Sequence, residues 1–244
     1  MSITAHVIVG SLVKTIGILG GSSDQATAEY YARINKLINA RLGGWHTGQI
    51  LIYSMDFAAS EHFVRNDLWD EAAAFLADKA QRLERAGADL LICVSNTLHR
   101  VADRIVSAVG IPFLHIVDPT AEAIRSAGLK RVGLLGTKPV MSLDYLKQRY
   151  RDCFGIEILV PSPPQQDTLD RIIFDELCRA IFTAPAKAAY LHAIDALHAR
   201  GAEGIILGCT EIPLLIAQQD RPKIPMFNTL ALHVEAAVGF ALAP

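Results

Sequence analysis

The stretch LLICVSNTLHRV, residues 90–101, decides how this chain is expected to fold. Its first half is an apolar run of strand length, which is typical of a buried strand. The run stops abruptly on the small polar side chains of Ser95-Asn96-Thr97, and the apolar spacing then becomes that of a helix. The stretch therefore predicts a buried strand, a polar strand end and a following helix.

A second stretch, IILGCTEIPLLI at residues 205–216, has the same pattern but stops on Cys209-Thr210-Glu211. The agreement extends further, because TIGILG near the start of the chain matches RVGLLG in its second half. Gly87 precedes Ser95 by eight residues, and Gly201 precedes Cys209 by eight residues as well. The chain is therefore expected to consist of two similar α/β halves, in which Ser95 and Cys209 occupy equivalent places.

Strand patterns alternate with helix patterns along the whole chain. Strands are predicted at residues 14–20, 48–57, 88–94, 111–117, 131–137, 156–161, 202–208 and 223–228. Helices are predicted after residue 24 and at residues 69–86, 96–109, 142–152, 168–182, 186–199 and 230–242, with a loop at 161–167. This alternation predicts parallel sheets with helices on both faces.

Open α/β sheets bind their ligands beyond the carboxyl ends of the strands. A pseudo-twofold axis between two similar three-layer α/β domains sets Ser95 and Cys209 facing each other across a cleft. The small polar residues at both strand ends therefore predict a ligand held between the two halves.

The composition is that of an ordinary globular protein, with 244 residues, 51% of them hydrophobic and 20% charged. The net charge is −2 and the basic residues are scattered, so neither a nucleic acid nor a membrane is expected as a partner. No apolar run reaches the roughly 18 residues that a membrane-spanning helix needs. Residues 1–13 are interpreted as an extension before the first strand, because they lack the charged start of an export signal.

The chain has four cysteines: Cys93, Cys153, Cys178 and Cys209. Their spacing contains no CxxC motif and no paired histidines, so no metal site is expected. Without an export signal the expected location is the cytoplasm, where these residues are free thiols.

Four segments carry a resemblance to a known family: ILGGSSDQATAEYYARIN at 18–35, SNTLH at 95–99, LLGT at 134–137 and GCTEIP at 208–213. Together they resemble the aspartate/glutamate racemase superfamily, whose enzymes work without pyridoxal phosphate. The resemblance runs from about Lys14 to the C-terminus. It is closest to the broad-specificity amino-acid racemase branch, through RLGG at 41–44, DELC at 175–178 and GCTEI.

The resemblance implies two α/β domains with the site between them, no cofactor, a small amino acid as the substrate, and a homodimer. Because the closing helix in this family packs on the first domain, the expected domains are residues 1–117 with 229–244, and residues 118–228. The family has a cysteine at each of the two strand ends. Cys209 matches the second, whereas Ser95 stands where the first is usually found. The broad-specificity branch resembles this chain in carrying a hydroxyl residue there.

The implied reaction is racemisation of an amino acid, with aspartate or glutamate as the expected substrate. Inversion at Cα needs one group that removes a proton from one face and another that delivers a proton to the opposite face. Cys209 is expected to be one of them, since neighbouring groups can lower the thiol pKa from about 8.5. Ser95 is expected to be the other, but a hydroxyl is a poor base that needs an activator.

Several alternatives at the first strand end stay open. His99 lies four residues after Ser95 and is one candidate activator, with a capping or packing role as the other interpretation. Ser95 is also suited to cap the following helix, or to anchor a substrate carboxylate. Cys93 has the side-chain parity of Ser95 but lies deeper along the strand, where a core role is expected. An engineered cysteine-to-serine replacement is a further possibility.

Substrate binding is expected from the remaining polar residues near the strand ends. Backbone N–H groups at the starts of the following helices favour a carboxylate. The predicted binding residues are Asn96, Thr97, Thr210, Gly21, Ser22, Ser54, Thr137 and Glu211. Arg179 is a weaker candidate for holding a side-chain carboxylate, and an exposed helix position is its simpler interpretation.

Two other functions compete with racemisation. The first is a decarboxylase or isomerase of the same superfamily, in which one thiol protonates a planar intermediate. The second is a catalytically impaired relative that binds an amino acid without exchanging its α-proton.

Overall fold

Eight strands form two parallel sheets within residues 13–244, the part of the chain that the computed structural model describes. The first sheet has the order β2-β1-β3-β4 and consists of β1 (Ile16–Gly20), β2 (Ile50–Ser54), β3 (Leu90–Cys93) and β4 (Phe113–Leu114). The second has the order β6-β5-β7-β8 and consists of β5 (Arg131–Leu135), β6 (Glu157–Leu159), β7 (Gly204–Leu207) and β8 (Met226–Asn228). The two sheets therefore have the same topology, as the internal repeat predicts.

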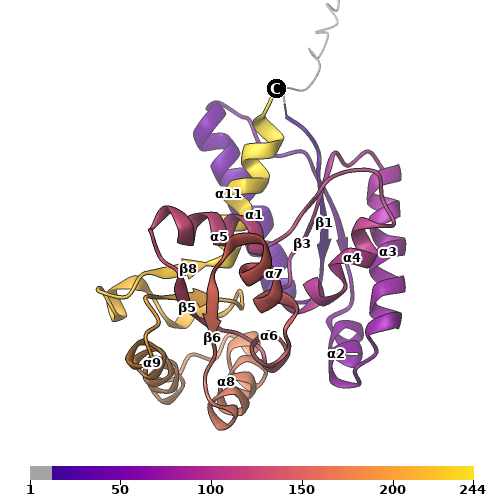
Figure 1. Ribbon diagram of the computed structural model, residues 1–244. Helices are drawn as coiled ribbons and strands as arrows, with labels where there is room; N and C mark the ends of the chain where they lie inside the picture. Colours follow the sequence, from indigo (N-terminus) through magenta and orange to yellow (C-terminus); the bar gives the residue numbers. More distant parts are fainter. Residues whose placement is uncertain (1–12) are drawn as a thin grey trace, which may run out of the picture.

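Helices cover the sheets on both faces (Figure 1). In the first half they are α1 (Asp24–Leu42), α2 (Phe57–Arg65), α3 (Trp69–Arg85), the 3-10 helix η1 (Thr97–Val101), α4 (Ala102–Val106) and α5 (Val117–Ser126). The remainder are α6 (Lys138–Ser142), α7 (Tyr145–Phe154), α8 (Pro163–Asp175), η2 (Leu177–Arg179), α9 (Ala184–Ala199), α10 (Ile212–Leu215), η3 (Gln218–Asp220) and α11 (Thr229–Leu242). The predicted two-part α/β fold is confirmed. None of the helices in the described residues has the length and apolarity needed to cross a membrane.

The central strands of the two halves end in the same way. In the first half the N–H of Val94 donates to the carbonyl of Leu19 at 3.1 Å, and in the second the N–H of Gly208 donates to the carbonyl of Leu135 at 2.7 Å. Ser95 and Cys209 each follow directly after these hydrogen bonds. The two residues therefore leave their sheets at equivalent positions.

Each sheet is buried between two apolar clusters. In β3, Leu90 and Ile92 pack with α1 and α11, whereas Leu91 and Cys93 pack with α3. This is the alternation of a strand that is buried on both faces. Cys93 is 0% exposed, and the predicted core role of this cysteine is confirmed.

The closing helix α11 packs beside α1, although the two lie at opposite ends of the chain (Figure 1). The buried hydroxyl of Tyr30 on α1 lies 2.9 Å from Nδ1 of His233 on α11. The N–H of Lys14 donates to the carbonyl of Ala241 at 2.9 Å, which ties the end of α11 to the chain just before β1. The extension predicted at residues 1–13 lies outside the described residues, except for Val13.

The structure corrects the sequence prediction in the first half. The predicted strand at 111–117 is only two residues long, because Val117 already begins α5. The helix predicted at 96–109 starts as η1 and continues as the short α4. Helix α2 was not predicted, although Asp56 caps it by accepting a hydrogen bond from the N–H of Ala58.

The predicted loop at 161–167 is the start of α8. Ser162 and Gln165 form a capping box, and Pro163 occupies the first turn. A proline in the first turn of a helix costs no hydrogen bond, since that N–H has no partner within the helix. Pro163 and Pro164 therefore mark the start of a helix rather than a loop.

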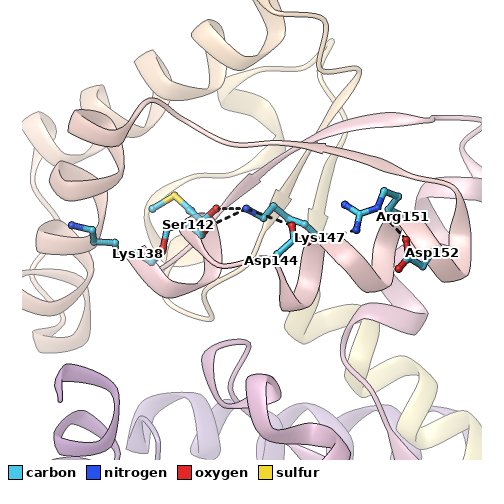
Figure 2. Close-up of polar contacts among 7 residues, drawn as sticks. Lys138, Ser142, Asp144, Lys147, Arg151 and Asp152 are labelled. Atoms are coloured by element: carbon cyan, nitrogen blue, oxygen red, sulfur yellow. Dashed lines mark hydrogen bonds and ion pairs between the residues drawn. The ribbon is translucent and has the colours of Figure 1, made fainter. Parts of the chain in front are cut away.

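Helix α6 starts at the end of β5 and is held at its other end by a lysine from α7 (Figure 2). The Nζ atom of Lys147 donates to the carbonyls of Met141 and Ser142 at 3.3 and 3.1 Å, and lies 3.9 Å from Asp144. The last carbonyls of a helix have no partner within it, and a cation satisfies them well. These contacts fix the C-terminal end of α6, the short helix that follows Thr137.

Two glycine substitutions test the tight packing of the repeated strands. A Cβ atom at Gly17 lies 2.8 Å from the Leu91 side chain and 2.9 Å from the Ala88 Cβ, whereas a Cβ atom at Gly239 on α11 meets nothing within 4 Å. We expect Gly17→Ala to lower the free energy of unfolding by about 1–3 kcal/mol through overpacking. We expect Gly239→Ala to raise it by about 0.4–1 kcal/mol. Urea unfolding of both variants measures this, and changes of the same sign contradict the packing argument.

Candidate active site

A cavity that opens to solvent lies where the carboxyl ends of the central strands of both sheets meet. Segments that follow β1, β3, β5 and β7 all contribute to its walls, together with α2 and α8. The lining residues are Ser22, Ser23, Phe57, Ser60, Glu61, Val64, Arg65, Val94, Ser95, Asn96, Thr97, Thr137, Ile173, Phe174, Cys178, Gly208, Cys209, Thr210 and Glu211.

Cys209 is held by the residue that begins the next helical turn. Its Sγ lies 2.9 Å from Oε2 of Glu211, and the hydroxyl of Thr210 donates to the same oxygen at 2.8 Å. Burial raises the pKa of the Cys209 thiol well above its ordinary value, and the negative charge of Glu211 raises it further. The backbone N–H of Glu211 acts in the opposite direction by favouring the thiolate. At neutral pH the protonated thiol is therefore the favoured form of Cys209.

Ser95 lines the same cavity from the other half. Its Oγ accepts a hydrogen bond from the N–H of Leu98 at 3.3 Å, as a helix-capping serine does. A serine hydroxyl that accepts from a backbone N–H still has its own proton to donate. The predicted capping role and a role as proton donor are therefore compatible.

His99 is not placed to activate Ser95. Its Nδ1 lies 2.7 Å from the carbonyl of Ser95, which requires Nδ1 to be the donor, and its Nε2 accepts from the N–H of Ile116 at 3.1 Å. Burial lowers the pKa of His99 to about 3. With both ring nitrogens occupied, the neutral ring fixes the backbone at Ser95. This is the packing role that the sequence left open.

Three predicted binding residues connect the two halves. The hydroxyls of Thr97 and Thr137 lie 3.0 Å apart, one after β3 and the other after β5. The amide of Asn96 donates to the hydroxyl of Thr229 at 3.1 Å, and its carbonyl accepts from the hydroxyl of Tyr145 at 3.1 Å. These contacts hold the strand ends together across the cleft. The structure also brings Ser22, Thr210 and Glu211 to the cavity.

Two predicted binding residues do not line the cavity. Ser54 is exposed at the end of the edge strand β2. Gly21 has a φ of +83°, and a Cβ atom there meets the carbonyl oxygen of Met55 at 2.0 Å. Only glycine fits this turn, which positions Ser22 instead of reaching the ligand itself. The weaker candidate Arg179 is exposed and also lies outside the lining.

Helix α2 supplies site residues that the sequence reasoning missed. Arg65 lies at the cavity with Nη1 3.4 Å from Asp170 and Nε 3.5 Å from Glu61. Its guanidinium packs on the ring of Phe174 at 4.3 Å from the centroid, so it connects α2 with α8. Phe57, which starts α2, also lines the cavity. The cap at Asp56 was the sequence signal for this helix, but only the fold places it at the cavity mouth.

Cys178 is a further residue that the reasoning did not place at the site. It lines the cavity from η2, and burial raises its pKa to about 12. The cavity therefore contains two thiols, both from the second half, whereas the first half contributes hydroxyl side chains that include Ser95. Within residues 13–244, no group of three or more potential ligands among His, Cys, Asp and Glu is arranged to hold a metal ion.

Comparison with known proteins agrees with this geometry. Residues 16–237 match the family model for Asp/Glu/Hydantoin racemase. The broad specificity amino-acid racemase RacX of Bacillus subtilis (strain 168) is 31% identical over 236 residues, which cover 93% of this chain and 98% of RacX.

Two solved structures are similar over almost the whole chain. A candidate Asp/Glu racemase from Yersinia pestis is 40% identical with a TM-score of 0.88, and the match covers 94% of this chain and 100% of that one. An aspartate racemase homologue from Pyrococcus horikoshii OT3 is 33% identical with a TM-score of 0.81, with the same coverage. With a family model that spans nearly its whole length, this chain belongs to the Asp/Glu/Hydantoin racemase family and is an isomerase of the racemase type.

Proposed function

We propose that this enzyme racemises an α-amino acid of the aspartate/glutamate type, with broad specificity and without a cofactor. One observation carries the proposal: Cys209 and Ser95 leave their sheets at equivalent positions and line the same cavity. The similarity to RacX supports broad specificity as part of the proposal. The domain boundaries, the homodimer and the cytoplasmic location expected from the sequence stay predictions.

In this mechanism the two walls have different tasks. The thiolate of Cys209 removes the α-proton, because the thiolate is the basic form of a cysteine. The hydroxyl of Ser95 delivers a proton to the opposite face, and the N–H of Leu98 stabilises the charge that then develops on Oγ. Water from the cleft returns a proton to Ser95, and the hydroxide left behind takes up the proton that Cys209 acquired, so both groups return to their starting states. A racemisation has an equilibrium constant of one, so kcat/KM is the same in both directions, but the weakly basic hydroxyl makes α-proton exchange at the face of Ser95 slower than exchange at the face of Cys209.

The substrate carboxylate is assigned to the strand-end segments that include Asn96, Thr97 and Thr210. All three residues line the cavity close to the two reacting side chains. Because the Asn96 amide is already bonded to Thr229, its side chain positions the segment and its backbone faces the ligand. Donors fixed in this way stabilise the carbanion-like charge without reorganisation.

Proton exchange in heavy water tests the two-wall mechanism. We expect each enantiomer of a substrate to take up deuterium at Cα, the one facing Cys209 faster. In Ser95→Ala, racemisation falls by about 10²-fold or more, while the enantiomer facing Cys209 still exchanges with retention. In Cys209→Ala, exchange from that enantiomer is lost. Mass spectrometry with chiral chromatography measures both quantities.

The same experiment separates the rival functions. Equal exchange from both enantiomers that survives the loss of either side chain is incompatible with two opposed groups. Decarboxylation of a malonate-type acid without any racemisation identifies the single-thiol reaction instead. Saturable amino-acid binding without exchange identifies an impaired relative.

Alkylation of Cys209 tests the electrostatics of the site. Because the Glu211 charge raises the Cys209 pKa, we expect Glu211→Gln to lower that pKa, so that the thiolate appears at lower pH. At pH 8 iodoacetamide should then label Cys209 faster in the variant than in the wild type. Burial, the larger cause of the shift, is unchanged, so the pKa stays above its ordinary value. Peptide mass spectrometry distinguishes Cys209 from Cys153 and Cys178.

Glu61→Gln serves as the matched control, because Glu61 lines the same cavity at its exposed rim but is not bonded to Cys209. An unchanged labelling profile is expected there. The electrostatic account fails if Glu61→Gln accelerates labelling as much as Glu211→Gln does.

A further inference from the structure

Glu211 has a buried carboxylate oxygen without a partner. The residue is 3% exposed and lines the cavity. Oε2 accepts from both Cys209 and Thr210, whereas Oε1 is buried and accepts no hydrogen bond from any described residue. Among buried side chains an unpaired acceptor is rare and costly, because it has given up its water. The missing donor must therefore come from something that enters the cavity.

The described residues around the cavity offer no free cation to this oxygen. Among the described residues that line the cavity, Arg65 is the one basic side chain. It is already paired with Asp170 and Glu61 and is stacked on Phe174. Asp170 itself is 6% exposed and also accepts from the backbone N–H of Lys138 at 2.7 Å, which holds that pairing in place. The described lining of the cavity therefore lacks positive charge next to Glu211.

We propose that Oε1 of Glu211 accepts a hydrogen bond from the α-ammonium group of the substrate, so that the site selects free α-amino acids. This inference rests on the proposed function and names the group by which the substrate is recognised. The matching family includes hydantoin racemases by its description, and a hydantoin carries its nitrogen as a neutral ring amide. A malonate-type acid has no amine at all. Of these three chemistries only the amino acid brings a cation to a buried carboxylate.

The position of Glu211 also connects recognition with acid/base chemistry. Its other oxygen contacts Sγ of Cys209, and its negative charge favours the protonated thiol. An ammonium group on Oε1 offsets that charge, so the bound substrate favours the thiolate. The Cys209 thiol is therefore protonated before substrate binds, and it releases its proton to water in the cleft once an amino acid is in place. A ligand without the ammonium group lacks this effect.

Binding of matched ligand pairs tests the inference. The amino acids are racemic aspartate, glutamate, homoserine, lysine and alanine. Their partners lack only the α-amino group: succinate, glutarate, 4-hydroxybutyrate, 6-aminohexanoate and propionate. We expect at least one amino acid to bind the wild type about 10- to 100-fold more tightly than its partner, as a charged hydrogen bond predicts. Isothermal titration calorimetry measures both dissociation constants.

Glu211→Gln keeps the shape of the side chain and removes its charge. We expect the preference for the amino acid to fall below about threefold in this variant, while the partner acid binds as in the wild type. Unchanged binding of the partner acid also shows that the variant is folded. Glu61→Gln, the same change at the rim of the cavity, is expected to keep the full preference.

Three results overturn the inference: no amino acid binds better than its partner, the preference survives in Glu211→Gln, or Glu61→Gln removes it. In the first case a buried water is the partner of Oε1. Failure of the proposed function has a different signature, because the ligand preference is then present and depends on Glu211 while no α-proton exchanges. If the enzyme racemises its substrate but its preference for the amino acid over the partner acid does not depend on Glu211, then this inference is rejected and the proposed function stands.

Discussion

Parallel pairing of the central strands in both halves is the constraint on which the active site depends. Parallel strands end at the same edge of their sheet, and the residues that follow them share that edge. The N–H groups of Val94 and Gly208 make the last hydrogen bonds of these strands, so the next residue in each half leaves the sheet at the same level. The hydroxyls of Thr97 and Thr137, whose oxygens lie 3.0 Å apart, then connect the two edges at one point of the cleft. A thiol and a hydroxyl are thereby brought to one cavity.

The electrostatics of the cavity follow from its burial. Glu211 is buried and lies in contact with the partly buried Cys209, so the charge of Glu211 acts strongly on the thiol. The same burial keeps the nearby histidines neutral, lowering the pKa of His99 to about 3 and that of His233 to about 4. Neutral histidines act here as hydrogen-bonding spacers: His233 lies between Tyr30 and the carbonyl of Leu114. The acid/base chemistry is therefore concentrated on the strand ends.

In the proposed mechanism Ser95 and Cys209 have unequal roles, because one is a hydroxyl and the other a thiol. Ser95 receives a backbone N–H on its oxygen and has no basic partner, which suits delivery of a proton. Cys209 has two opposing neighbours: the Glu211 carboxylate favours the protonated thiol, and the backbone N–H of Glu211 favours the thiolate. The protonation state of this thiol therefore changes when the charge around it changes. A pseudo-symmetric scaffold therefore supports an asymmetric reaction.

The sequence by itself determined the two α/β halves, because the strand patterns and the repeated spacing from Gly87 to Ser95 and from Gly201 to Cys209 are local features. It also singled out Ser95 and Cys209 as candidate site residues, since polar residues that end an apolar run stand out in a linear pattern. The sequence pattern did not predict the first turn of α8, because Pro163 and Pro164 suggested a loop. Ser162 and Gln165 form a capping box for the helix there. Only the tertiary structure decided that Arg65 lies at the cavity, that Ser54 does not, and that both nitrogens of His99 are occupied. These facts depend on how α2 and the strand ends meet segments far away in the chain. The unpaired oxygen of Glu211 belongs to the same class, because burial and missing partners are properties of packing and not of spacing.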